Sequence, residues 1–85
     1  MFGNKVRKFV VMDGSNKRFL NEIIGLVEMC TGKSYKFRSI KCKKIDRDHP
    51  TMMVVSFKTN YRKFDYLRKL LTKAYPEQCV FDAPL

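Results

Sequence analysis

Three short segments of the chain contain residue types that can do chemistry. TGKS at 31–34 offers a glycine, a lysine and a hydroxyl group, which are the residue types that hold phosphate. DRDH at 46–49 places two carboxylates beside the only histidine, and DGSNKR at 13–18 combines a turn with two cations. Each segment has to be judged by the element that positions it.

The surroundings of the first two segments argue against a site. The first glycine of a P-loop would stand at position 27, which is Val27, and TGKS follows a predicted helix, whose C-terminal dipole repels phosphate. DRDH lies in a short predicted hairpin turn without a further ligand. We therefore expect no metal, no cofactor and no enzymatic activity.

DGSNKR is better placed, because it joins a predicted strand to the start of a predicted helix. Free N–H groups at a helix N-terminus attract anions, and Lys17 and Arg18 add positive charge. Two interpretations remain open for this segment: a phosphate contact, or a plain turn and helix cap.

The cysteines at 30, 42 and 79 are odd in number and form no CxxC motif. We expect three free thiols, as in a cytoplasmic protein. The chain begins without the pattern of a signal peptide, and no apolar run is longer than the four residues of Met52–Val55, so we expect no membrane insertion.

The charge of the chain is its strongest functional signal. The 85 residues include 18 Lys and Arg but only 8 Asp and Glu, which gives a net charge of +10. A surface of this kind attracts polyanions, which are nucleic acid, an anionic membrane or an acidic protein.

Apolar periodicity predicts four strands and two helices in one domain, 1–85. The strands are predicted at 5–12, 34–45, 51–58 and 78–82. One helix begins after Ser15 as N-cap and ends at Thr31-Gly32, with an apolar face of Leu20, Ile23, Ile24, Val27 and Cys30.

The second predicted helix begins after Thr59 or Asn60 and stops at Pro76, with an apolar face of Phe64, Leu67, Leu71, Ala74 and Tyr75. The order βαββαβ predicts an α+β, ferredoxin-like fold, in which two helices pack on one face of a four-stranded antiparallel sheet.

Alternation then divides the strand residues between the helix-covered face and the open face of the sheet. We expect Met53, Val55 and Phe57 to face the helices, with Val10 and Met12. The open face is then predicted to hold Arg7, Phe9, Val11, Met52, Val54, Ser56 and Lys58.

The segment KSYKFRSIKCKKI at 33–45 leaves two alternatives. Tyr35 and Phe37 share one parity, and Ile40 and Cys42 share the other. With a bulge near Arg38-Ser39 both pairs face the core; without it, the two aromatic rings stand on the open face among lysines.

The predicted layout resembles RNA-recognition motifs, which share the βαββαβ order and stack bases on strand aromatics. Phe9 in KFVVMD stands at a position like their first-strand aromatic, whereas MMVVSFKT lacks their third-strand pattern. The order is equally similar to ACT-like regulatory domains, and one fold of this kind hosts many functions.

We therefore expect a small binding module that contacts nucleic acid, RNA or single-stranded DNA, mainly through phosphates. The alternative is a protein-interaction or regulatory module, which would dimerise through the open sheet face or, as a phage-type accessory protein, bind an acidic host partner. The candidate contact residues are Arg7, Phe9, Lys17, Arg18, Lys33, Tyr35, Lys36, Arg38, Lys41, Lys43, Lys44, Lys58, Arg62, Lys69 and Lys73.

Overall fold

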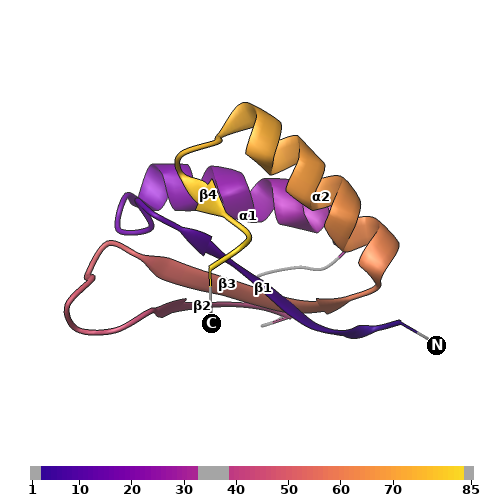
Figure 1. Cartoon of the computed structure of the whole chain (residues 1–85), viewed down its shortest axis with the longest axis horizontal. Helices are drawn as coiled ribbons and strands as arrows, with labels where there is room; N and C mark the ends of the chain where they lie inside the picture. Colours follow the sequence, from indigo (N-terminus) through magenta and orange to yellow (C-terminus); the bar gives the residue numbers. More distant parts are fainter. Residues whose placement is uncertain (1–2, 33–38, 84–85) are drawn as a thin grey trace.

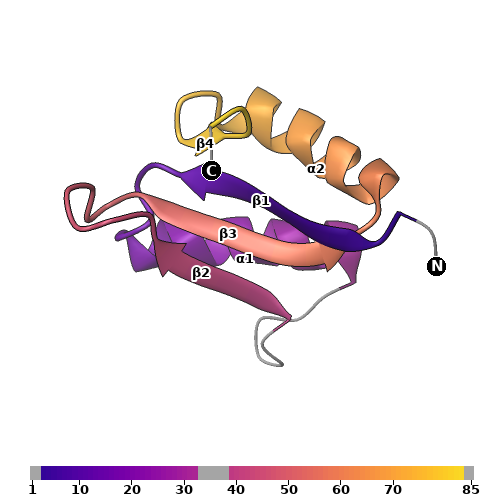
Figure 2. The same cartoon turned by 60° about the horizontal axis from the view of Figure 1, so that its bottom comes forward.

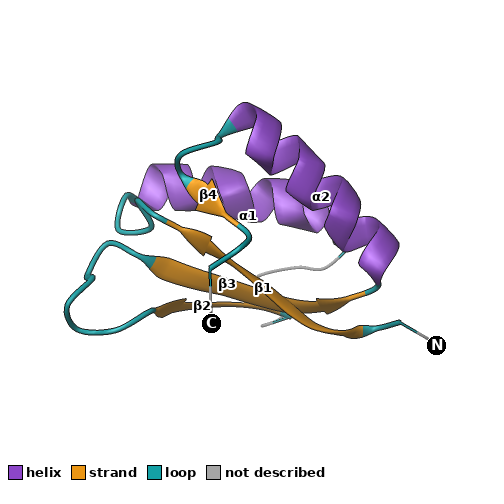
Figure 3. Cartoon of the chain, viewed as in Figure 1, coloured by secondary structure: helices purple, strands orange, loops and turns teal. Residues whose placement is uncertain are grey.

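The chain builds a layer of two helices on a four-stranded antiparallel sheet (Figure 1). The structure is a computed structural model, and it describes residues 3–32 and 39–83. In chain order the elements are β1 (Lys5–Val11), α1 (Lys17–Thr31), β2 (Ile40–Lys44), β3 (Met53–Thr59), α2 (Tyr61–Ala74) and β4 (Cys79–Val80). Figure 3 shows that both helices lie on the same side of the sheet.

The strands are ordered β2-β3-β1-β4, and all neighbours are antiparallel. The longest pairing joins β1 to β3, from Lys5 opposite Thr59 to Val11 opposite Met53. Figure 2 shows β1 and β3 at the centre of the sheet and β2 along one edge. The element order and the two helical segments agree with the sequence prediction.

The core lies between the sheet and the two helices. Its buried members come from the strands and both helices: Phe9, Val11, Ile23, Ile24, Val27, Ile40, Val55, Phe57, Leu67, Leu71 and Cys79. The predicted apolar faces of α1 and α2 contribute residues to this core, which confirms the two helices predicted from the 3.6-residue spacing. Ala74 is the exception, because it lies exposed at the end of α2.

The helix ends follow from local side-chain chemistry. Asn16, and not the predicted Ser15, caps α1, because Asn16 has an extended backbone and its Oδ1 accepts a hydrogen bond from the N–H of Phe19 at 3.2 Å. Gly32 ends α1 as predicted, with a φ of 71°. Of the two predicted caps for α2, the structure uses Asn60, whose Oδ1 accepts from the N–H of Lys63 at 2.9 Å.

The predicted assignment of β1 to the two faces was wrong. Phe9 and Val11 lie in the core, whereas Met12 is exposed beyond the end of the strand. Val10 is buried as predicted, but on the opposite parity, beside Val54 and Val80 of the neighbouring strands. The open face of β1 therefore consists of Val6, Lys8 and Val10.

The other strands follow the predicted parity more closely. Val55 and Phe57 of β3 are buried, and Ile40 and Cys42 of β2 face the core. β4 is shorter than the predicted 78–82, and β3 begins two residues later than predicted. The question of a bulge at Arg38-Ser39, and with it the placement of Tyr35 and Phe37, lies outside the described residues.

The turn after β1 is joined to the β2–β3 loop by a backbone hydrogen bond. The N–H of Gly14 donates to the carbonyl oxygen of Thr51 at 2.7 Å. A side chain at position 14 would have its Cβ 2.5 Å from Met53 Cβ and 3.2 Å from the Thr51 oxygen. The close approach of these two loops therefore requires glycine.

The described residues, 3–32 and 39–83, form two helices, α1 and α2. Neither helix is long and apolar enough to cross a membrane.

Candidate nucleic-acid interface

The open face of the sheet is a lysine-rich surface built by three adjacent strands. Its central row runs from Lys8 on β1 through Ser56 on β3 to Lys41 on β2, because Ser56 is the register partner of both lysines. Two strand spacings separate the lysine backbones, about 10 Å. The Ser56 hydroxyl lies between them and can donate a hydrogen bond to a bound oxyanion.

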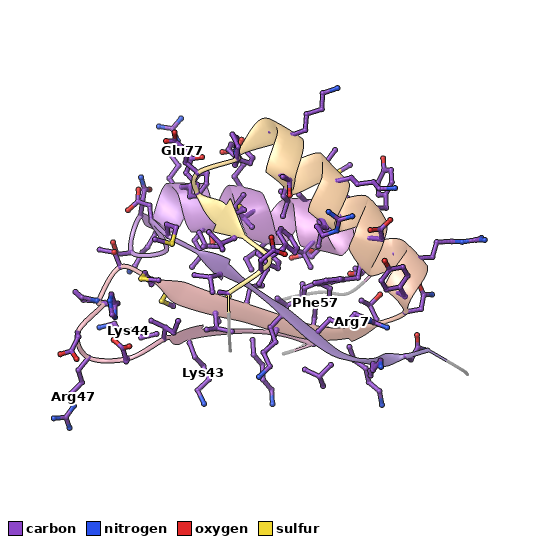
Figure 4. All side chains as sticks on the ribbon, viewed as in Figure 1. Arg7, Lys43, Lys44, Arg47, Phe57 and Glu77 are labelled. Atoms are coloured by element: carbon purple, nitrogen blue, oxygen red, sulfur yellow. The ribbon has the colours of Figure 1, made fainter. Side chains whose placement is uncertain are left out.

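The two neighbouring rows add further cations. Lys43 of β2 is opposite Val54, and Lys58 of β3 is opposite Val6. We call the set Lys8, Lys41, Lys43, Lys58 and Ser56 the lysine face. Figure 4 shows Lys43 pointing away from the helices, on the uncovered side of the sheet.

The lysine face has no acidic counterpart on its own strands. The sequences of β1, β2 and β3 contain no Asp or Glu, so all 8 carboxylates of the chain lie in helices, turns and loops. Within the described part of the chain, none of the four lysines forms an ion pair. Four neighbouring ammonium groups without compensation raise the local concentration of anions.

The surface between the lysines is a shallow groove open to solvent. One depression is lined by Val6, Lys8, Lys41, Lys43, Lys44, Val54 and Ser56. A second depression shares Val6, Lys41 and Ser56 with the first and continues to Ser39 and Lys58. An apolar floor with cationic walls suits an extended anionic chain better than a small enclosed ligand.

Two predicted contact residues on β1 do not reach this face. Phe9 is fully buried and stacks on Phe81 with ring centroids 4.6 Å apart, so it is unable to stack on a base. Arg7 lies on the helix side, as Figure 4 shows, with its guanidinium carbon 5.6 Å from the Tyr61 ring centroid and its Nε donating to the carbonyl oxygen of Thr59. The predicted orientation of both side chains was wrong.

Other predicted contact residues belong to different surfaces. Lys17 and Arg18 are exposed in the first turn of α1, within the helix layer. Arg62, Lys69 and Lys73 are exposed on α2. Lys33, Tyr35, Lys36 and Arg38 lie outside the described residues. From the predicted set, the structure thus brings together Lys41, Lys43 and Lys58 on the open sheet face, with Lys44 at the end of β2.

Sequence reasoning missed Lys8, the cation on β1 that completes the central row. Assigning Phe9 to the open face automatically sent Lys8 to the core side. The strand alone carries no signal that decides this, because Arg7 shares the parity of Phe9 and either assignment turns one cation toward the helices.

The other groups that could do chemistry are occupied by local structure. The Asp46 carboxylate accepts hydrogen bonds from the backbone N–H of His49 at 2.8 Å and pairs with its ring Nδ1. This interaction lowers the pKa of Asp46 and closes the β2–β3 loop. Residues 3–32 and 39–83 contain no group of three His, Cys, Asp or Glu side chains that could hold a metal ion.

The three cysteines are free thiols, which confirms the sequence prediction. Burial raises the pKa of Cys42 and of Cys79 to about 11, and it also raises the pKa of Cys30. A thiol with a raised pKa is a poor nucleophile at neutral pH. The cysteines therefore behave as apolar packing residues.

Comparison with protein-family models, with curated proteins and with solved structures gives no match.

Proposed function

We propose that this protein is a small, non-catalytic, ferredoxin-like module of the cytoplasm that binds nucleic acid through its lysine face. The observation that carries the proposal is the row Lys8–Ser56–Lys41, flanked by Lys43 and Lys58 on strands without a single carboxylate. Duplex DNA carries one negative charge per about 1.7 Å of helix axis, so a surface of this kind attracts it strongly.

The expected mode of binding is contact with the phosphate backbone. Lysine ammonium groups and the Ser56 hydroxyl contact phosphate oxygens and carry no direct sequence information. The described part of the open face has no aromatic ring, and Phe9 is in the core. We therefore expect similar affinity for single strands and duplexes from this face, with little dependence on base sequence.

The alternative of dimerisation through the open sheet face has weaker support. It required Phe9, Val11, Met52 and Val54 to form an exposed apolar patch, whereas Phe9 and Val11 are fully buried. Two copies of the lysine face would also place like charges against each other, which costs energy. An acidic protein remains the competing partner that fits the same charges.

The proposal is tested by fluorescence anisotropy with labelled RNA, single-stranded DNA and duplex DNA. The non-specific electrostatic contribution corresponds to a Kd on the order of 10⁻⁴ to 10⁻⁶ M near physiological salt, with tighter binding at low salt. Absence of binding to all three at low salt would contradict the proposal and favour an acidic protein partner.

A further inference from the structure

A second basic surface lies on α2, which belongs to the helix layer. Arg62, Tyr66, Lys69 and Lys73 are spaced by four, three and four residues, so they form one stripe along the helix. All four are exposed, and the buried side chains of the same helix are Leu67 and Leu71, on the opposite side. We call these four residues the α2 stripe.

The charge of α2 is not a general property of the helix layer. α1 carries two cations and two carboxylates, whereas α2 carries five cations and the single carboxylate Asp65. Asp65 accepts hydrogen bonds from Arg68 at 2.6 Å and pairs with Lys69 at 3.1 Å. Arg62 and Lys73 form no ion pair within the described residues, so the stripe keeps a positive excess.

The stripe also contains a feature that solvation alone does not require. Tyr66 leaves 62% of its surface exposed, with Arg62 one turn before it and Lys69 and Lys73 after it. Its ring makes none of the close aromatic contacts found among the described residues. An exposed ring among cations is the combination with which proteins stack and hold single-stranded nucleic acid.

The α2 stripe and the lysine face point in opposite directions. In Figures 1 and 3, α2 belongs to the helix layer on one side of the sheet, and the uncovered face of the sheet forms the other side of the molecule. Along the vertical axis of Figure 1, which runs from the helix layer to the open sheet face, the molecule extends 27 Å. The Debye length at physiological salt is about 8 Å, so polyanions on the two surfaces repel each other only weakly.

From this arrangement we infer that the α2 stripe is a second nucleic-acid surface and that one chain bridges two segments of nucleic acid. The inference rests on the proposed function for the lysine face and adds an activity to it. One segment lies across the sheet and is held through phosphates, and the other lies along α2, where Tyr66 stacks on a base and the cations contact phosphates.

Bridging is measured by capture of a fluorescent oligonucleotide on beads that carry an unlabelled, non-complementary oligonucleotide. The wild-type chain is expected to retain the fluorescent strand on the beads. Sedimentation at the same concentration is expected to show a monomer. Capture by a dimer would overturn the inference, because two single-surface copies would then explain it.

Two variants separate the surfaces, and both change exposed residues. Lys41→Gln/Lys43→Gln weakens the lysine face, and Arg62→Gln/Tyr66→Ala/Lys73→Gln weakens the α2 stripe. Each variant is expected to lose at least ten-fold in capture while still binding a single oligonucleotide in anisotropy. Lys17→Gln/Arg18→Gln on α1 is the control of equal charge, and it is expected to retain capture.

Substitution of Tyr66 tests the stacking of its ring on a base separately from charge, because it changes no charge. In the Lys41→Gln/Lys43→Gln background, Tyr66→Ala is expected to weaken single-strand binding about 5- to 150-fold, whereas Tyr66→Phe retains it. Equal affinities for these two variants would overturn the role of the ring.

The possible failures are distinguishable. If the wild-type chain binds in anisotropy but captures nothing on beads, the bridging inference is wrong and the proposed function stands. If it binds no nucleic acid at low salt, both are wrong.

Discussion

At the scale of single residues, adjacent positions on β1 have opposite roles. Phe9 makes an edge contact with Phe57, with centroids 6.3 Å apart, in addition to its stack on Phe81. Its neighbour Lys8 points to the other side of the sheet and has no carboxylate partner among the described residues. The alternation of the strand therefore separates a residue that stabilises the fold from a residue that we expect to contact phosphate.

Replacement of Phe9 by alanine is expected to destabilise the fold, because its ring is buried in the core. The loss of a buried aromatic ring typically costs about 3–5 kcal/mol, a large part of the stability of a small domain. Val6→Ala, on the open face and 62% exposed, is the control and is expected to change stability by less than about 0.5 kcal/mol. Urea unfolding measures both; equal effects would contradict the register of β1.

The sequence did not determine which face of β1 is buried, and the reason is physical. Val6, Val10 and Met12 share one parity and Phe9 and Val11 share the other, so both sides of the strand are apolar. Arg7 shares the parity of Phe9, and a charged residue there argues against burial of that side of the strand. In the structure, however, the Arg7 guanidinium lies over the rings of Tyr61 and Phe64 of α2. Only the position of α2 in the fold reveals this contact.

The two most buried thiols give a second residue-scale prediction. Burial raises the pKa of Cys42 and Cys79 from 9.0 to about 11, so at pH 8 their thiolate fraction is about 100-fold lower than in the unfolded chain. Iodoacetamide, followed by mass spectrometry, is expected to label both more slowly in native protein than in urea, because fewer thiolates are present and access to them is restricted. Three labelled thiols in urea verify that none is bridged; equal native and unfolded rates would contradict their burial.

At the scale of elements, the helices were more predictable than the strands. A helical face of five apolar residues extends over three turns and tolerates one misassigned position, as Ala74 shows. Helix caps depend on one side chain and one backbone conformation, so the sequence pattern predicts the α1 cap one residue too early, at Ser15. β4 retains only Cys79–Val80 because its limits depend on pairing with β1.

Two glycines provide matched tests of element packing. Gly14→Ala is expected to destabilise the protein by about 1–3 kcal/mol, because the new Cβ would overlap with Cβ and Cγ of Met53. Gly25→Ala, in the middle of α1, would place its Cβ where no atom beyond the local helix backbone lies within 4 Å, and it is expected to stabilise by roughly 0.5–1 kcal/mol. Thermal unfolding measures both, and stabilisation by Gly14→Ala would contradict the loop contact.

At the scale of the whole molecule, the net charge can be read from the sequence, whereas the positions of the charges on the surface depend on the fold. The value of +10 follows from composition alone, and it predicts a basic surface without saying where that surface lies. The candidate contact residues nevertheless fall on three separate described surfaces: the open sheet, the first turn of α1 and the outer side of α2. Composition gives no directions in space, so the division into surfaces required the fold.

The salt dependence of binding by a lysine-face variant tests the central claim most directly. In the proposed mode, each phosphate contact contributes a slope of about −0.9 to log K against log salt on duplex DNA. Lys8→Gln/Lys41→Gln removes both lysines of the central row, whereas Lys17→Gln/Arg18→Gln removes two cations from the helix layer.

The lysine-face variant is expected to flatten the wild-type slope on duplex DNA by about 1.8 units, and the α1 variant by well under half of that. Equal slopes for the two variants would mean that only net charge attracts nucleic acid, and this result would contradict a binding site on the open sheet face.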